Sequence, residues 1–293
     1  MKPTSIARSA FAFFLSCGFS ALSLDEGYAA TLLFQDTFTN RSLDASKWLP
    51  FICGNKADHS EGGWPWSYQP GQPRPSSSCD RPNGHIADYD LPANISTGSG
   101  LCLKAQAGTS ATGYSWTSAT ICSYPVTNLF ATNAGFTFTN GYVEVRAKIP
   151  SNNGSWSSIW FMPGPGSAGG EIDLQESGYL MGKTNPVSPD QVMACNYHAP
   201  GNSPVIINTG TDLSADYHRY GMEYLNGKSI KMFLDGALVA SFATNISSGS
   251  YYIILNNKIA SPATKSWHSQ TNNLTPNPIY DYVSYVKVYD SRP

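Results

Sequence analysis

The chain has 293 residues, of which only 13% are charged, about half the share found in ordinary globular domains. Its 18 Lys and Arg nearly balance its 20 Asp and Glu. This argues against nucleic-acid binding, which needs clustered basic charge. A hydrophobic content of 41% and a net charge of −2 also exclude a disordered chain.

The first residues have the pattern of a secretory signal. Lys2 and Arg8 precede an apolar stretch over residues 10–24, and small residues follow it. We expect residues 1–30 to be a signal peptide and residues 31–293 to form a single domain, secreted to the extracellular space or periplasm. No later stretch approaches the roughly 18 apolar residues of a membrane helix, so we expect no membrane partner.

Short runs of β-branched and aromatic residues recur along the rest of the chain, separated by Gly, Asn, Pro and Ser. No amphipathic helix of ten or more residues is apparent. Apolar and polar residues alternate over 143–149, which predicts an antiparallel strand with one side on a core. Asp235 and Gly236 predict a hairpin turn. Many short strands at this spacing predict an all-β sandwich or barrel. The predicted strands are 32–38, 142–149, 157–162, 192–197, 217–224, 230–234, 238–242, 251–255 and 282–289.

Residues 54–100 differ from the rest of the chain, because they are rich in Gly and Pro and poor in strand formers. A long irregular segment in a compact domain usually carries function, so we expect a loop at the edge of a binding cleft. Trp64, Trp66 and Tyr68 lie close together in it. These rings either bind substrate or form a satellite hydrophobic cluster under the loop.

Six cysteines suit an oxidising compartment. The first, Cys17, lies in the signal segment and leaves a lipid anchor through this cysteine as an alternative to a released protein. We expect Cys53 to pair with Cys79 across a long loop, and Cys102 to pair with Cys122 across a hairpin. Cys195 then remains as a buried, inert thiol.

The segment 169–178 places three acidic residues within six positions. On a strand, Glu171 and Asp173 share a face because side chains alternate. Strict alternation would put Glu176 on the other face. One extra residue, a β-bulge around 174–175, would return Glu176 to the face of the other two.

A row of three carboxylates raises the pKa of at least one of them, so that one stays protonated near neutral pH. Cleavage of a glycosidic bond needs this combination of an ionised carboxylate and a protonated carboxylic acid. In a retaining glycosidase the two groups lie about 5–5.5 Å apart. The alternatives for such a segment are a calcium site and a solvated acidic face.

The pattern Glu-x-Asp-x-x-Glu resembles the catalytic signature of glycoside hydrolase family 16, in the bulged form of its laminarinase-like members. Other segments resemble parts of the same family in the family's order, and together they cover nearly the whole mature chain. These segments are 36–38, 43–48, 141–150, 156–163, 196–198, 217–220, 233–236 and 285–289.

The resemblance implies a β-jelly-roll sandwich of two antiparallel sheets with a concave substrate cleft. It implies that Glu171 is the nucleophile and that Glu176 is the general acid/base. Asp173 would lie between them and titrate as part of a coupled set.

Aromatic residues near the acidic segment are candidates for sugar binding. The resemblance implies that Trp156 and Trp160 form a sugar platform, since aromatic faces stack on the apolar face of a pyranose ring. His198 is either a cleft residue that hydrogen-bonds a sugar or a structural histidine. Trp267 either binds substrate or packs within a loop.

The sequence departs from the family pattern in two places. Ser157 and Ser158 replace the usual Pro-Ala pair, and Ser284 stands where many relatives have an acidic calcium ligand, with Asp281 three positions earlier. We expect no cofactor and no metal in catalysis. A structural calcium ion would lack that ligand.

The resemblance implies endo-hydrolysis of a neutral β-linked polysaccharide with retention of configuration, most simply a β-1,3-glucan or a mixed β-1,3/1,4-glucan. One alternative is a galactan hydrolase of the same fold, of the agar or carrageenan type. The other is a non-catalytic glucan-binding protein. We expect a monomer whose partner is the polysaccharide.

Overall fold

The computed structural model describes residues 29–50, 87–108, 115–124, 126–127, 132–133, 135–150, 153–182, 184 and 186–293. The expectations for the signal peptide up to residue 28 and for most of the 54–100 segment lie outside these residues. So do those for Cys53, Cys79, Trp64, Trp66 and Tyr68.

Strands dominate the described residues. They are β1 (Leu32–Asp36), β2 (Asp88–Asp90), β3 (Ile95–Ser96), β4 (Leu101–Ala107), β5 (Trp116–Cys122), β6 (Val126–Thr127), β7 (Thr132–Asn133), β8 (Gly141–Lys148), β9 (Ser155–Pro163), β10 (Ile172–Glu176), β11 (Val192–Tyr197), β12 (Val205–Asn208), β13 (His218–Leu225), β14 (Ser229–Leu234), β15 (Ala237–Phe242), β16 (Tyr251–Ile259) and β17 (Ile279–Tyr289). The helices in this part of the chain are single 3₁₀ turns, η1 (Pro92–Asn94), η2 (Pro189–Gln191) and η3 (Pro262–Thr264). None of them has the length or apolar character needed to cross a bilayer.

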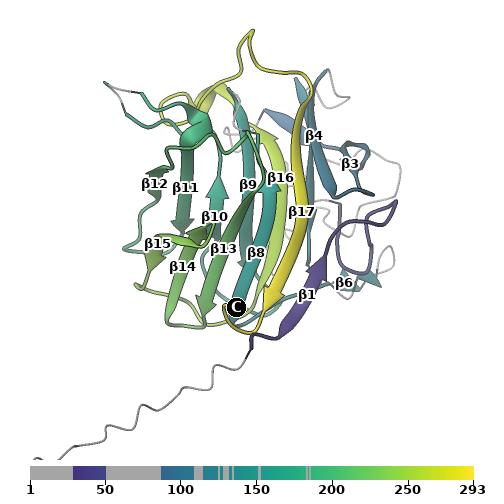
Figure 1. The fold of residues 1–293 in the computed structure, drawn as a ribbon, viewed down its shortest axis with the longest axis vertical. Helices are drawn as coiled ribbons and strands as arrows, with labels where there is room; N and C mark the ends of the chain where they lie inside the picture. Colours follow the sequence, from purple (N-terminus) through teal and green to yellow (C-terminus); the bar gives the residue numbers. More distant parts are fainter. Residues whose placement is uncertain are drawn as a thin grey trace, which may run out of the picture.

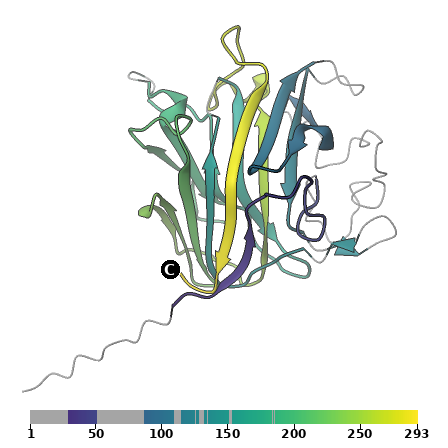
Figure 2. The same cartoon turned by 45° about the vertical axis from the view of Figure 1, so that its right-hand side comes forward.

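The strands pack as two layers (Figures 1 and 2). One layer has the order β12-β11-β10-β9-β16-β5, and the other has the order β4-β17-β8-β13-β14-β15. Among the described strands, the pairing that joins the two layers is that of β4 with β5, through Gln106 and Ala107. Neighbouring strands within each layer run antiparallel, while β2 pairs with β5 in parallel. The predicted all-β sandwich is confirmed.

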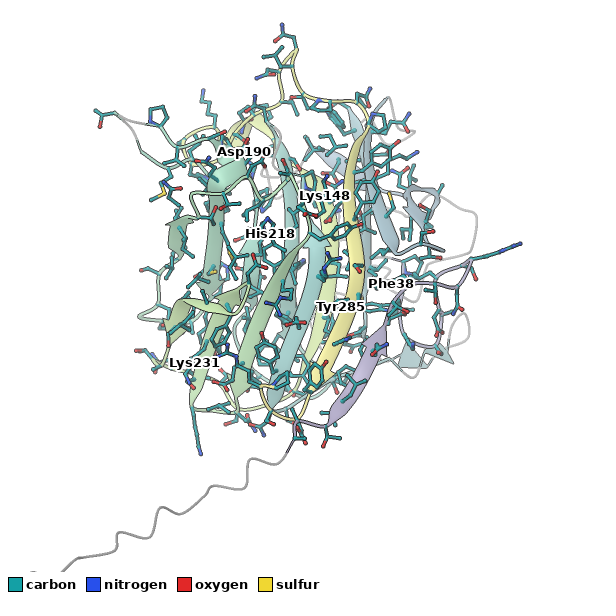
Figure 3. All side chains as sticks on the ribbon, in the orientation of Figure 1. Phe38, Lys148, Asp190, His218, Lys231 and Tyr285 are labelled. Carbon is teal, nitrogen blue, oxygen red and sulfur yellow. The ribbon has the colours of Figure 1, made fainter. Side chains whose placement is uncertain are left out.

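Alternation within each strand builds the core between the layers. On β8, Val143, Val145 and Ala147 are fully buried in the main hydrophobic cluster. The intervening polar residues of β8 are only partly buried. Figure 3 labels two residues of this layer, Lys148 of β8 and Tyr285 of β17. The layer therefore has an apolar inner face and a polar outer face, as the alternation over 143–149 predicted.

The predicted strands all occur, with ends that differ by a few residues. The expectation of an irregular segment over 54–100 is wrong at its C-terminal end, because β2, η1 and β3 lie within it. Buried polar contacts hold β2 in place. Asp88 and Asp90 accept hydrogen bonds from Ser118, and Lys258 Nζ lies 2.6 Å from Asp90 Oδ2.

The expected disulfide between Cys102 and Cys122 is wrong, since neither cysteine is in a disulfide. After their short shared ladder, β4 and β5 separate into different layers. Cys102 then lies opposite Tyr282 in one layer, and Cys122 lies opposite Ile254 in the other. Cys195 is buried, as expected for an inert thiol, and its Sγ donates to the Leu174 carbonyl over 3.2 Å.

Candidate active site

The three acidic residues come from β10 and the residue before it, between β9 and β11. Asp173 lies opposite Trp160 of β9, and two residues later Gln175 lies opposite Ile159, so one residue of β10 is extra. The register with β11 shifts over the same stretch. This is the predicted β-bulge, and it returns Glu176 to the face of Asp173.

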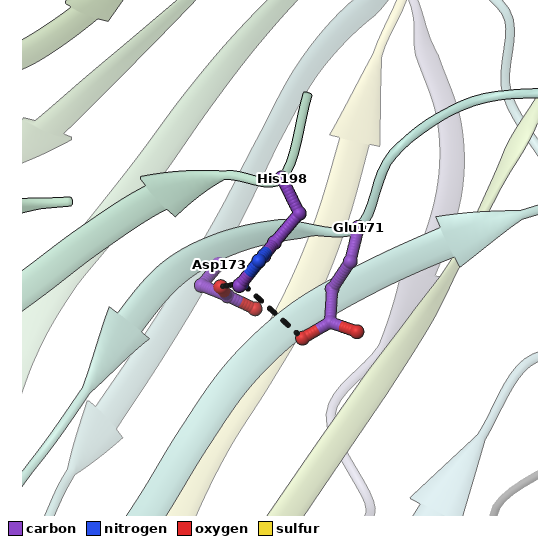
Figure 4. A group of neighbouring side chains, drawn as sticks. All are labelled: Glu171, Asp173 and His198. Carbon is purple, nitrogen blue, oxygen red and sulfur yellow. Dashed lines mark hydrogen bonds and ion pairs between the residues drawn. The ribbon is translucent and has the colours of Figure 1, made fainter. Parts of the chain in front are cut away.

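Glu171 and Asp173 meet the same histidine (Figure 4). His198 Nε2 lies 2.8 Å from Asp173 Oδ2 and 3.7 Å from Glu171 Oε1. The Asp173 side chain is 3% exposed, whereas those of Glu171 and His198 are 36% and 52% exposed. The backbone N–H of His198 donates to the Glu171 carbonyl, which ties the end of β11 to the start of β10. Glu171 is therefore the accessible carboxyl of this pair.

All three carboxyl groups bind protons more strongly than exposed carboxyls do. Burial and the charge of Asp173 raise the pKa of Glu171 to about 8. Burial also raises the pKa of Glu176 to about 7, with a contribution from the charge of Glu171. The pKa of Asp173 lies well above its usual value because of burial and the charge of Glu176. Near neutral pH the cluster therefore retains protonated carboxyl groups, which general acid catalysis requires.

Both oxygens of Glu176 accept hydrogen bonds from aromatic residues. Trp156 Nε1 donates to Oε1 over 2.8 Å, and the Tyr179 hydroxyl donates to Oε2 over 3.1 Å. Trp156 was expected to serve as a sugar platform, and the structure shows that its indole N–H is directed at the acidic cluster. Its ring remains partly exposed.

Trp160 lies beside Asp173 in the β9–β10 register, and its ring is partly exposed. Its Nε1 donates to Asn256 Oδ1 of β16 over 2.6 Å. Asn256 in turn donates to the Trp156 carbonyl over 3.2 Å. A single buried amide therefore links both expected platform residues.

Trp267 is part of a wall of aromatic rings beside Glu176. Its ring lies 5.2 Å from that of Trp156 and 5.1 Å from that of Tyr179. His268 is fully buried behind them, with its ring 4.9 Å from Trp156. The two alternatives for Trp267 are thus compatible, because it packs against the residues that contact Glu176 and is itself partly exposed.

Three further residues of the site were not predicted from the sequence: Tyr179, Asn256 and His268. The sequence signal for Tyr179 is its position three residues after the acidic motif, just beyond the turn at Gly178. Asn256 lies on a strand that was predicted to end at residue 255. His268 lies in a loop, and its proximity depends on how the loop folds back on the sheet.

Glu171, Asp173 and His198 also offer three ligand atoms within 4.8 Å of one another. Calcium takes six to eight oxygen ligands, and His198 Nε2 already bonds Asp173. We therefore assign no metal here. Asp281 faces the core, where Ser157 donates to it over 2.5 Å.

Solved structures share this fold. The laminarinase catalytic domain of Thermotoga maritima aligns with a TM-score of 0.64 at 20% identity, over 91% of this chain and 100% of that one. At this identity the likeness concerns the fold, and it confirms the β-jelly-roll sandwich.

Curated relatives also match in sequence. A keratan-sulfate endo-1,4-beta-galactosidase of Sphingobacterium multivorum is 30% identical over 53% of this chain and 37% of that protein. Glucan endo-1,3-beta-glucosidase A1 of Niallia circulans is 26% identical over 70% of this chain and 28% of that protein. The chain spans about a third of the length of these relatives.

The model of glycosyl hydrolases family 16 matches residues 106–282, which is more than half of the chain and includes the acidic cluster and its aromatic wall. The family match, the bulged acidic strand and the shared fold agree with the resemblance inferred from the sequence. The chain belongs to glycosyl hydrolase family 16.

Proposed function

We propose that this protein is a secreted, monomeric endo-glycosidase that hydrolyses a neutral β-glucan with retention of anomeric configuration. The observation that carries the proposal is the bulge in β10, which gathers Glu171, Asp173 and Glu176 on one face. Their raised pKa values keep a proton on the cluster near neutral pH, which supports a general acid among them.

In the first step, a Glu171 oxygen attacks the anomeric carbon, and the bond to the leaving-group oxygen breaks. The electron pair of that bond goes to the leaving oxygen, which takes the proton of Glu176. Glu171 suits the attacking role because it is the more exposed carboxyl of its pair. Attack requires its ionised form, which the His198 imidazole favours by lowering the pKa of Glu171.

In the second step, Glu176 takes a proton from water while the water oxygen bonds to the anomeric carbon. The bond to Glu171 breaks, and its electron pair returns to the carboxylate. Asp173 is buried between the two reacting carboxyls and bonds His198. It disfavours ionisation of all three groups together, which keeps a proton available to Glu176 between turnovers.

The substrate class rests on the relatives and on composition. A relative that acts on β-1,3-glucan matches 70% of the chain, and the low charge content suits a neutral polymer. The partly exposed rings of Trp156 and Trp160 offer stacking surfaces beside the acids. A galactan is the second candidate, because the galactosidase relative has the higher identity.

The decisive experiment measures new reducing ends from laminarin, lichenan and agarose, with Glu171→Gln as the control. We expect release from laminarin or lichenan and a loss of about 10³-fold or more in the variant. Release from agarose alone would favour the galactan alternative. Binding without release from any of the polymers would show a non-catalytic glucan-binding protein.

Secretion is part of the proposal and rests on Lys2, Arg8 and the apolar stretch that follows them. Expression of the full chain with N-terminal sequencing of the exported product tests it. We expect a mature N-terminus close to residue 30. An unprocessed chain that stays in the cytoplasm would contradict this part of the proposal.

A further inference from the structure

The two groups that donate hydrogen bonds to Glu176 differ in whether they can also accept one. The Trp156 indole N–H can only donate, so the oxygen that it contacts, Oε1, must act as an acceptor. The Tyr179 hydroxyl can donate or accept, so Oε2 can be bonded to it with or without a proton. The two oxygens of this carboxyl are therefore not equivalent.

We infer that Trp156 and Tyr179 are positioning residues that confine the catalytic proton of Glu176 to Oε2, the oxygen facing Tyr179. This inference rests on the proposed role of Glu176 as general acid/base. A proton on Oε1 would turn the oxygen that accepts from the indole N–H at 2.8 Å into a hydroxyl, which is a much weaker acceptor. A proton on Oε2 leaves the Trp156 bond intact.

The same arrangement serves both steps of the proposed reaction. When Glu176 gives its proton to the leaving oxygen, the Tyr179 hydroxyl donates to the Oε2 that is left ionised. When Glu176 later takes a proton from water, Oε2 receives it. The Tyr179 hydroxyl then either accepts a hydrogen bond from the protonated Oε2 or breaks its hydrogen bond to this oxygen. Tyr179 never loses its own proton, because burial and the charge of Glu176 raise its pKa above the ordinary tyrosine value.

Tyr179 is held in place by the loop that carries Trp267 and His268. Tyr179 and His268 form an isolated antiparallel bridge, and the backbone of Leu180 donates to the Trp267 carbonyl over 2.8 Å. Gly178 allows the turn between Glu176 and Tyr179, with a φ of +85° and with the His268 ring where a side chain would lie. The hydroxyl is thus positioned by backbone pairing as well as by ring packing.

Trp156 is fixed equally well. Its ring meets Trp267 at 83° and lies against the ring of His268, whose nitrogens lie within hydrogen-bond distance of the Ser177 and Ser269 carbonyls. Its backbone carbonyl accepts from Asn256. The indole therefore cannot easily turn to release Oε1.

Charged and hydrogen-bonding groups around Glu176 also shift its pKa. Glu171 raises its pKa, while Trp156, Tyr179 and His198 lower it. Asp173 on its own strand is also ionisable and titrates with it. Cys195 on β11 remains a neutral thiol, because burial and these acids raise its pKa. Removing either aromatic donor should thus make Glu176 hold its proton more tightly.

The test compares pH profiles of kcat/KM for the wild type, Tyr179→Phe and Trp156→Phe. Each variant loses a hydrogen bond to the ionised carboxyl, so we expect the alkaline limb to move up by roughly one pH unit. Tyr282→Phe, on the exposed face of β17, is the matched control and should not shift it. Lower activity with an unmoved alkaline limb in both variants would show a merely structural role and overturn the inference.

A neutron structure of the wild type at acid pH tests the position of the proton directly. We expect it on the oxygen facing Tyr179, and a proton on the oxygen facing Trp156 would overturn the inference. Azide rescue of Glu176→Gly separates this from the proposed function. If azide does not speed turnover of an activated aryl glycoside by Glu176→Gly, Glu176 is not the acid/base, whatever the Tyr179 and Trp156 variants show.

Discussion

Glu171 is the proposed nucleophile, and the roles assigned to the other carboxyls depend on this assignment. It is more exposed than Asp173 and lies at the entrance to β10, where an anomeric carbon could reach it. Glu171→Gly should abolish hydrolysis and leave space for a small anion. We expect azide to restore turnover of an activated glycoside and to give a glycosyl azide of inverted configuration, identified by NMR. The same product from Glu176→Gly alone would reverse the two roles.

His198 contributes to the ionisation of the two reacting carboxyls, beside the larger effect of burial. Its imidazole lowers the pKa of both Glu171 and Glu176. His198→Gln removes this influence and keeps a polar side chain beside Asp173. We expect the acid limb of the kcat/KM profile to move to higher pH by roughly one unit, because Glu171 then ionises later. An unchanged acid limb would mean that His198 does not affect the nucleophile.

Individual residues were predictable from the sequence where a motif fixes their spacing along one strand. The Glu171–Glu176 segment is such a case. Alternation places Glu171 and Asp173 on one face, and the resemblance to the bulged family motif supports the extra residue that returns Glu176 to that face. Tyr179 was missed because its contact depends on a turn and on a loop some 90 residues later in the chain, around His268. Trp156 was expected to present its ring to a sugar, and nothing in the sequence shows that its N–H meets Glu176.

Among the elements, the junction between β10 and β11 determines how Glu171 meets His198. The strands approach so closely here that a Cβ on Gly170 would lie 1.9 Å from the His198 carbonyl oxygen. Gly170→Ala should push the start of β10 away from the end of β11. We expect kcat to fall about 100-fold, since a displacement near 1 Å is enough for such a loss.

The matched control for this prediction is Gly108→Ala, where a Cβ meets nothing within 4 Å. Circular dichroism and thermal melting of both variants show whether the sandwich still forms. Full activity of Gly170→Ala would mean that the β10–β11 junction can relax without cost to the site.

Strands were predictable from the sequence where apolar and polar residues alternate clearly. The alternating segment 143–149 became β8, whereas β4 and β5 were not predicted. The expected Cys102–Cys122 disulfide assumed that two successive strands stay paired. Here β4 and β5 part into separate layers, and sequence periodicity does not show at which residue a hairpin opens.

At the scale of the whole molecule, buried acids make stability depend on pH. Burial raises the pKa of Asp281 to about 7 in the folded chain, and the three carboxyls of the acidic cluster are raised as well. A carboxyl with a raised pKa binds more protons in the folded state than in the unfolded state. The free energy of unfolding therefore falls as pH rises between the unfolded and folded pKa values. We expect the protein to be more stable near pH 5 than near pH 8.

Asp281 allows this to be tested away from the catalytic face, because it lies between the layers and accepts a hydrogen bond from Ser157. Asp281→Asn mimics the protonated acid and cannot ionise. Its stability relative to the wild type should increase as pH rises from about 4 to about 7 and then level off. The total gain should approach about 4 kcal/mol, since each pKa unit corresponds to about 1.4 kcal/mol. Urea unfolding at a series of pH values measures the difference, and curves that stay parallel throughout would show that Asp281 is ionised in the folded protein.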